Sequence, residues 1–459
     1  MGYDAGPSVP WSPDGPDDLR PLICLARGTI RAAALGTVLL AVGCASFPST
    51  PVGPDDIPAL ENQVARQPGN AEAHLRLGSA LASAGRCDEA VAAATRGGQL
   101  APANALGPLV AGRCLEGVGD YDEALALYGG FLDAHSDARG AAAVEGRRLI
   151  ALQAQARVQA RLALQREEAL APSGGEAVAV LPFLVDGDAE YQPLAAGLAH
   201  MLSTDLAVIG RFPLVERIRL DALLTELNLA SGVVDPSTAA RTGRLTGASR
   251  IIVGTLSLPE GRTLNLGGSI VLGSGESQTA ATADGVLADL LDLEKDYALE
   301  VAENLGYVLS EAERQRVLQN RPRSLAGFLA FSRGLLAEGR GDFGEAAAQY
   351  QEAVRRDPGF ADAATGLRRA VGAEIASDAG PGETANVVAR VDGRLASLQG
   401  ADPLAGALVS SVLDLASHQP ERATLDSGWA NTAIDALPGE ADFFPSLQAL
   451  ITIIILIPR

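Results

Sequence analysis

The sequence predicts a central α/β domain flanked on both sides by all-α helical repeats. The first observation is a pattern of small and aromatic residues that recurs with a period of about 34 residues in the N-terminal part. The second is the return of the same pattern after residue 322. The third is the stretch between them, where short apolar runs alternate with segments of helical periodicity, as is typical of α/β domains.

The composition of the 459 residues excludes several classes of function. The chain is long enough for roughly two to four domains. Its formal net charge of −20 and pI of about 4.6 leave no basic surface for a phosphate backbone, so nucleic acid is not expected as a partner. Lys295 is the single lysine, and no glycine-rich phosphate-binding loop precedes it.

Residues 1–44 are predicted to be a signal segment. Arg27 and Arg31 precede an apolar run at 32–42, which is too short for the roughly 20 residues that span a bilayer as a helix. The length of this run fits the apolar region of a secretory signal. An uncleaved signal anchor is the competing interpretation.

The apolar run ends in Leu-Ala-Val-Gly-Cys at 40–44. This segment resembles the lipobox of bacterial lipoproteins, in which small residues precede an acylated cysteine. Ala41 stands where leucine is usual, which is a departure from the pattern. The resemblance implies cleavage before Cys44, lipidation of Cys44 and anchoring to a membrane, and a cysteine that falls there by chance is the alternative. Residues 45–57 are predicted to be a flexible tether.

Residues 58–172 are predicted to form two helical repeats followed by a long helix. Small residues let the two helices of a unit approach closely, and an aromatic residue fills the gap to the next unit. The recurring packing positions are Gly78, Ala90, Gly112, Ala124 and Tyr128. Their spacing resembles that of tetratricopeptide repeats, which implies a groove that binds peptides or other subunits. Packing of helical hairpins without a ligand is the alternative.

The same signature predicts a further tetratricopeptide repeat at 322–370. Its packing positions are Gly334, Ala346, Tyr350, Ala353 and Pro358. Residues 371–459 are predicted to be a helical tail of uncertain structure. The last apolar segment, 450–457, is too short to span a bilayer as a helix. It is either a docking strand or a frameshifted end of the reading frame.

The first half of the central domain alternates strands with helices. An apolar run at 177–183 predicts a buried strand. Apolar residues that share one helical face predict a helix at 194–209. A second strand at 212–217 and a helix at 220–229 follow.

The second half of this domain opens with a helix and continues with paired strands. Asp235 as N-cap and Pro236 in the first turn predict a helix that ends near Gly247. Gly267 and Gly268 mark a bulge or a close approach within a strand. The strands are predicted at 250–258, 263–272 and 278–283, and a closing helix at 287–305.

Four of these segments, in this order, are AVAVLPF, GLAHMLSTDLA, FPLVERIRLDALLTEL and TGRLTGASRIIVGTL. They resemble the periplasmic domain of CsgG-type outer-membrane lipoproteins, which include curli assembly and FlgO-like proteins, and the resemblance covers residues 175–310. It implies a periplasm-facing protein that is anchored to the outer membrane by its lipid. It also implies partners among the cell-envelope proteins and a capacity to form homo-oligomers.

The resemblance leaves two functions open. One is a lipid-anchored scaffold for protein interactions in outer-membrane secretion or surface-structure assembly. The alternative is an oligomeric CsgG-like secretion pore subunit, since each subunit of the curli channel contributes two membrane hairpins. Strands of such hairpins need roughly 9–11 residues, and here only 250–258 and 263–272 are predicted to be long enough. The sequence therefore favours the scaffold.

No catalytic, metal or cofactor site is predicted. The sequence lacks a GxSxG and an HExxH motif, and no two of its histidines have the spacing of metal ligands. We therefore expect neither an enzyme nor a cofactor. The histidines are His74, His135, His200 and His418.

The cysteines fit an exported protein. Cys24 precedes the proposed cleavage and Cys44 would carry the lipid, which leaves Cys87 and Cys114 in a compartment that permits disulfides. Cys87 is predicted at the turn of the first repeat and Cys114 late in the first helix of the second. Because stacked repeats bring these positions together, a disulfide between them is predicted, with two buried free thiols as the alternative.

Overall fold

The computed structural model describes residues 52–170, 176–211, 213–229, 235–259, 263–380 and 383–399. The predictions for the signal segment, for Cys44 and for the apolar end at 450–457 therefore lie outside the described residues. Val52 and Ile57 are buried in a core that also holds Leu81. The tether prediction is wrong for these last residues, because their apolar side chains join the core of the first helices.

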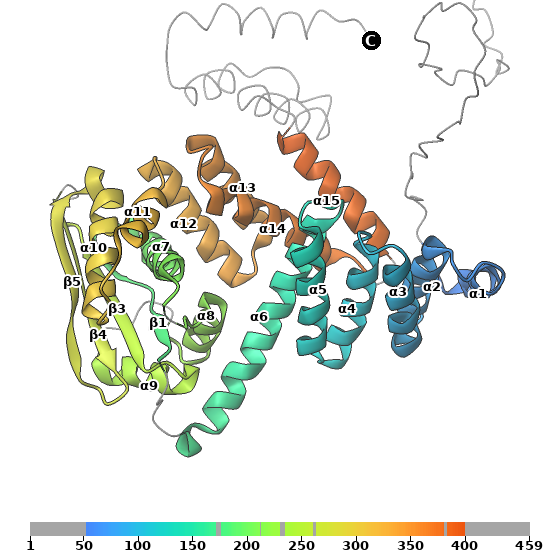
Figure 1. Cartoon of the computed structure of the whole chain (residues 1–459), viewed down its shortest axis with the longest axis horizontal. Helices are drawn as coiled ribbons and strands as arrows, with labels where there is room; N and C mark the ends of the chain where they lie inside the picture. Colours follow the sequence, from blue (N-terminus) through green and yellow to red (C-terminus); the bar gives the residue numbers. More distant parts are fainter. Residues whose placement is uncertain are drawn as a thin grey trace, which may run out of the picture. The chain divides into compact units, whose positions relative to one another are not determined.

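The α/β domain is built on one mixed sheet in the order β1-β3-β4-β5, with β2 also pairing with β3 (Figure 1). β1 and β2 run parallel to β3, whereas β4 and β5 continue the sheet in the antiparallel sense. This sheet and its helices confirm the α/β class of the central region. The strands are β1 (Val178–Val180), β2 (Leu184–Asp186), β3 (Arg250–Ser257), β4 (Thr263–Leu272) and β5 (Ser277–Val286).

Helices cover both faces of the sheet. On one face, Ile251 of β3 shares a core with Leu220 of α8 and with residues of α9. On the opposite face, Gly268 of β4 lies directly against the Tyr297 hydroxyl of α10, and α7 packs beside α10. A register shift follows Gly268, which confirms the predicted bulge. The helices are α7 (Leu194–Ile209), α8 (Arg217–Glu226), α9 (Pro236–Thr246) and α10 (Leu290–Asn304).

A capping side chain and a glycine set the two ends of α9. The Asp235 carboxylate accepts a hydrogen bond from the Thr238 backbone N–H at 2.9 Å, which caps the first turn. Gly247 ends the helix with φ of 80°, a left-handed conformation that glycine adopts without steric cost. The predicted start and end of this helix are confirmed.

Two strand predictions differ from the structure. The strand predicted at 212–217 is reduced to one bridge between Val178 and Leu214, because α8 already begins at Arg217. β5 has 10 residues and extends to Val286. Most of its side chains are exposed or half-buried, so it shows no apolar run in the sequence. β3 has 8 residues and falls short of the roughly 9–11 of a barrel strand, whereas β4 and β5 reach it, so the long hairpin of the described residues is β4–β5 and not the predicted pair at 250–258 and 263–272.

Apart from α11, the remaining helices form the helical array. The α/β domain is inserted into it between α6 and α12. Consecutive helices pack as pairs, α2 with α3, α4 with α5, and α12 with α13. No helix of the described residues has both the length and the apolar character needed to cross a bilayer. The array comprises α1 (Ile57–Arg66), α2 (Ala71–Ser83), α3 (Cys87–Leu100), α4 (Leu106–Val118), α5 (Tyr121–His135), α6 (Ala141–Gln165), α12 (Leu325–Arg340), α13 (Phe343–Arg356), α14 (Ala361–Asp378) and α15 (Thr384–Gln399). α11 (Glu311–Gln319) packs on α7 and α10 and belongs to the α/β domain.

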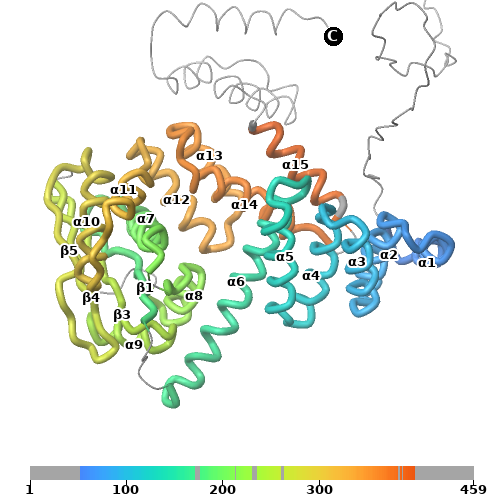
Figure 2. Tube along the Cα trace, viewed as in Figure 1, coloured from blue at the N-terminus to red at the C-terminus, as the bar shows by residue number. Residues whose placement is uncertain are grey.

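The two parts of the array meet where α6 crosses α14 (Figure 2). A Cβ added to Gly146 would overlap the backbone of Gly372 and Ala373, and one added to Gly372 would overlap the Ala142 carbonyl. The two backbones are therefore in contact at this crossing. The helices before and after the α/β domain form one packed group, and the boundary predicted at residue 370 falls inside α14.

Candidate interaction site at the junction of the helical array and the α/β domain

The predicted packing positions of the repeats lie inside the helical pairs, with one exception. Gly112 lies directly against the Tyr128 ring, and a Cβ added to Gly334 would lie 2.6 Å from the Tyr350 ring. Pro358 is exposed in the turn after α13. It ends a helix that its ring cannot continue, and it does not pack. The other positions, Gly78, Ala90, Ala124, Ala346 and Ala353, are buried.

Tyr128 contacts Glu116, a residue that no repeat signature marks. The Tyr128 hydroxyl donates to Glu116 Oε1 at 2.7 Å. Arg147 of α6 donates to both oxygens of the same carboxylate, at 2.9 and 2.7 Å. Arg147 and Glu116 are 13% and 7% exposed, so this is a partly buried ion pair. It fastens α6 to the pair α4 and α5.

The same three residue types recur in the second part of the array. The Tyr350 hydroxyl donates to Glu338 Oε2 at 3.2 Å, and Arg369 of α14 donates to that oxygen at 2.9 and 2.7 Å. In both sets the tyrosine follows the glutamate by 12 residues and the arginine follows it by 31. These equal offsets are visible in the sequence and identify α6 and α14 as equivalent helices.

Glu338 also binds the α/β domain, which Glu116 does not. Arg217 of α8 donates to Glu338 Oε1 at 2.7 Å and to Asp221 Oδ2 at 2.7 Å. Gln153 of α6 donates to the Glu338 carbonyl at 2.7 Å. We call Glu338, Arg217, Asp221, Arg369 and Tyr350 the Glu338 cluster. It joins α8 of the inserted domain to α12, α13 and α14 of the helical array.

In the Glu338 cluster, two guanidinium groups lie against two carboxylates. Burial alone would raise the pKa of Glu338, whose side chain is fully buried, but the positive charges of Arg369 and Arg217 outweigh it and hold that pKa below its ordinary value. Burial raises the pKa of the Tyr350 hydroxyl, which therefore stays protonated and donates. Glu338 is thus an ionised carboxylate that accepts from two guanidinium groups and one hydroxyl.

A second buried charge cluster lies within the α/β domain. Lys295 of α10 donates to Asp205 of α7 at 2.5 Å, and Asn320 after α11 donates to the other Asp205 oxygen at 3.1 Å. The Lys295 ammonium also lies 3.1 Å from Glu294, but neither Glu294 oxygen receives a hydrogen bond. Burial and repulsion from Asp205 raise the pKa of Glu294 to about 8. Asp205 therefore links α7 to α10 through Lys295 and to the end of α11 through Asn320.

The described histidines lie apart from one another, each against its own neighbours. His200 lies 3.3 Å from the Asp362 carboxylate, and His74 lies 3.1 Å from the Pro68 carbonyl. The His135 ring packs against Phe131. Within the ranges that the structure describes, no three His, Cys, Asp or Glu side chains are placed to hold a metal ion. His418 lies outside these ranges.

Cys87 and Cys114 lie next to each other as free thiols, the first half-buried and the second buried. Burial, together with a hydrogen bond to Cys87, raises the pKa of the Cys114 thiol to about 12. Cys114 is therefore protonated at neutral pH, and its thiol is a poor nucleophile in that state.

The disulfide between Cys87 and Cys114 stays a prediction. We expect mass mapping without reductant of protein taken from an oxidising compartment to recover the Cys87 and Cys114 peptides linked. Reduction should lower the free energy of unfolding by about 2 kcal/mol, since the bond restricts the unfolded chain. The double variant Cys87→Ser and Cys114→Ser should not respond to reductant. Recovery of both as free thiols would rule out the bond.

The fold and the junction define a class of protein, in which a small α/β domain is inserted into a helical array and ion-paired to it. Residues 160–290 match the family model described as "Curli production assembly/transport component CsgG". The match begins in α6 and ends at the first residue of α10, so it contains Arg217 and the whole sheet, whereas Glu338 and Arg369 lie beyond it. The chain therefore carries a CsgG-type domain, a domain associated with the envelope and with secretion or assembly of surface structures. No curated protein matches the chain.

Proposed function

We propose that this protein is a lipid-anchored, periplasm-facing scaffold on the outer membrane. It binds other envelope proteins in secretion or surface-structure assembly and carries out no chemistry of its own. The observation that supports this function is the ion pair of Arg217 with Glu338, 2.7 Å long and buried on the glutamate side. This ion pair connects the CsgG-type domain to the helical pairs. A rigid connection of this kind would let the protein hold its partners in fixed positions.

The tetratricopeptide character of the helical pairs is part of this proposal. The contacts of Gly112 with Tyr128 and of Gly334 with Tyr350 support it, as do the equal offsets of the two glutamate–tyrosine–arginine sets. Repeats of this type stack into extended surfaces that bind peptides or subunits. Homo-oligomers built through these surfaces belong to the same proposal.

The lipid anchor is tested at Cys44. Replacing Cys44 with serine removes the thiol that would be acylated, and we expect the protein to move from the membrane fraction to the soluble periplasmic fraction. Cys24→Ser is the matched control, since Cys24 precedes the proposed cleavage and should leave the fractionation unchanged. A Cys44→Ser protein that stays with the membrane would remove the anchor from the proposal.

The scaffold role is tested by crosslinking in the native envelope. We expect the helical array and the α/β domain to crosslink to the same envelope proteins, and these crosslinks to fall in the Cys44→Ser variant as the protein leaves the membrane. Recovery of nothing but copies of this chain would contradict the scaffold.

The length of β5 keeps a second candidate function in view. β3 has 8 residues, fewer than the roughly 9–11 of a barrel strand, whereas β4 and β5 have 10 each, so among the described residues the β4–β5 hairpin alone is long enough for the strands of an oligomeric secretion pore. In the structure these strands pair with one another in the domain's own sheet, which favours the scaffold. Detergent extraction followed by electron microscopy separates the two, because ring-shaped particles with a channel would establish the pore.

A further inference from the structure

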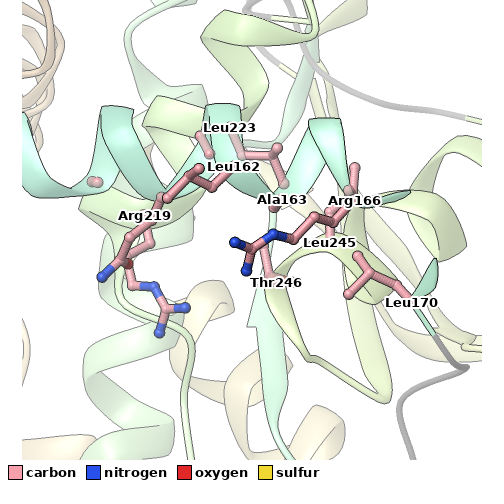
Figure 3. A pocket seen from close by; sticks show the side chains of 11 residues that line it. Leu162, Ala163, Arg166, Leu170, Arg219, Leu223, Leu245 and Thr246 are labelled. Carbon is pink, nitrogen blue, oxygen red and sulfur yellow. The ribbon is translucent and has the colours of Figure 1, made fainter. Parts of the chain in front are cut away.

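A pocket with a volume of about 360 Å³ lies between α6, α8 and α9 (Figure 3). Its origin is the alanine-rich face of α6, where Ala156 and Ala160 pack against Leu223 and Leu245. Alanine side chains are too short to fill the space between helices, so the contact leaves a hollow. The volume lies within the range of ligand pockets, which runs from about 300 to 1,000 Å³.

The rim of this pocket exposes large apolar side chains. Leu162 on α6 is 41% exposed and Leu170 just beyond it is 37% exposed. Val158, one turn before Leu162 on the same helix, is 44% exposed. Leu162 and Leu170 line the same pocket, and apolar side chains gathered at one opening mark a contact region more often than single exposed residues do.

Two arginines flank the same opening. The side chains of Arg166, just after the end of α6, and of Arg219 on α8 extend over the pocket (Figure 3). Among the described residues, neither guanidinium has a carboxylate within salt-bridge distance. The nearby acids are engaged by other arginines, since Arg161 binds Glu226 at 2.8 Å and Arg241 binds Glu167 at 2.6 Å.

We propose that this pocket binds an acidic amphipathic helix of a partner protein. A helix in a groove places apolar side chains three and four residues apart into the hollow, while its carboxylates meet cations at the rim. The two guanidinium groups at the rim supply local positive charge for the carboxylates of such a helix, on a chain whose net charge of −20 otherwise repels anions. The inference rests on the proposed scaffold function, for which it names the chemistry of one partner.

The test is a charge swap with a designed peptide. The probe is a labelled 14-residue helix with leucines on one face and glutamates beside them, compared with the same peptide carrying lysines. We expect the intact protein to prefer the glutamate peptide. The double variant Arg166→Glu and Arg219→Glu should lose about tenfold or more in affinity for it and gain affinity for the lysine peptide, since two rim pairs change from attraction to repulsion.

Arg157→Glu is the matched control, because Arg157 is exposed on the same helix and does not line the pocket. It should leave both affinities unchanged. No binding of the glutamate peptide, or equal binding of both peptides, would overturn the proposal. Binding of oleate without binding of the glutamate peptide would assign the pocket to a fatty acid instead and overturn it as well. Envelope crosslinks that persist in the double variant would leave the scaffold function intact while the pocket proposal fails.

Discussion

Replacing Glu338 with glutamine is expected to lower the free energy of unfolding by about 3–5 kcal/mol. The substitution keeps the shape of the side chain but removes the charge that faces Arg217 and Arg369. Arg217 retains Asp221 at 2.7 Å, whereas Arg369, whose side chain is 30% exposed, loses its counter-ion. Breaking such an ion pair from one side is costly because the remaining charge loses its partner and is only partly solvated. Denaturant unfolding at neutral pH measures the effect.

The Glu338 effect should depend on pH with a defined sign. The folded pKa of Glu338 is lowered, so its contribution is complete above the unfolded value near 4.3 and is lost as the pH falls through the folded value. The stability difference between the natural protein and Glu338→Gln should therefore shrink below about pH 4. A difference that does not change with pH would contradict the ionised state of Glu338.

Glu303→Gln provides the control for Glu338. Glu303 on α10 pairs with Arg314, and both side chains are exposed, at 45% and 38%. Water already solvates such a pair, so this variant should unfold almost like the natural protein. A loss at Glu303 as large as that at Glu338 would show that burial does not set the cost.

Replacing Gly146 with alanine is expected to destabilise the protein by about 2–3 kcal/mol. In an ordinary helix this change stabilises by about 1 kcal/mol, because alanine has the higher helix propensity. Here the new Cβ would overlap backbone atoms of Gly372 and Ala373 in α14. Backbone cannot rotate away as a side chain can, so the two helices must separate and lose their contact. Thermal unfolding measures the change.

Gly130→Ala gives the matched control on α5. Gly130 is exposed, and a Cβ added to it would meet no atom within 4 Å. The same substitution should therefore stabilise the protein at Gly130 and destabilise it at Gly146. Stabilisation at both positions would show that α6 and α14 do not touch through their backbones.

Local chemistry explains the parts of the fold that could be predicted from sequence. Asp235 and Gly247 bound α9 because a capping side chain and a left-handed glycine act on neighbouring residues only. The strands at 250–257 and 263–272 follow from apolar runs separated by turn residues. β5 was predicted too short because its exposed side chains break that pattern.

Only part of the candidate site could be predicted from the sequence. Tyr128 and Tyr350 were identified by repeat spacing, and their glutamate and arginine partners follow at equal offsets that a closer comparison of the repeats would reveal. The pocket beside Arg166 and Arg219 gave no such signal. It arises from the alanines of one helix that face leucines of others, and no spacing within one segment encodes that.

The sequence by itself determined the classes of the elements, the repeated packing positions and the resemblance of the central segment to an assembly family. Only the tertiary structure decided that the two helical regions are one array, joined where Gly146 meets Gly372. The physical reason is the distance along the sequence over which each interaction acts. Caps, periodicity and turns act over a few residues, whereas the α6–α14 crossing and the pairing of Arg217 with Glu338 depend on segments more than a hundred positions apart. In the sequence, Gly146 and Gly372 appear only as residues of low helix propensity.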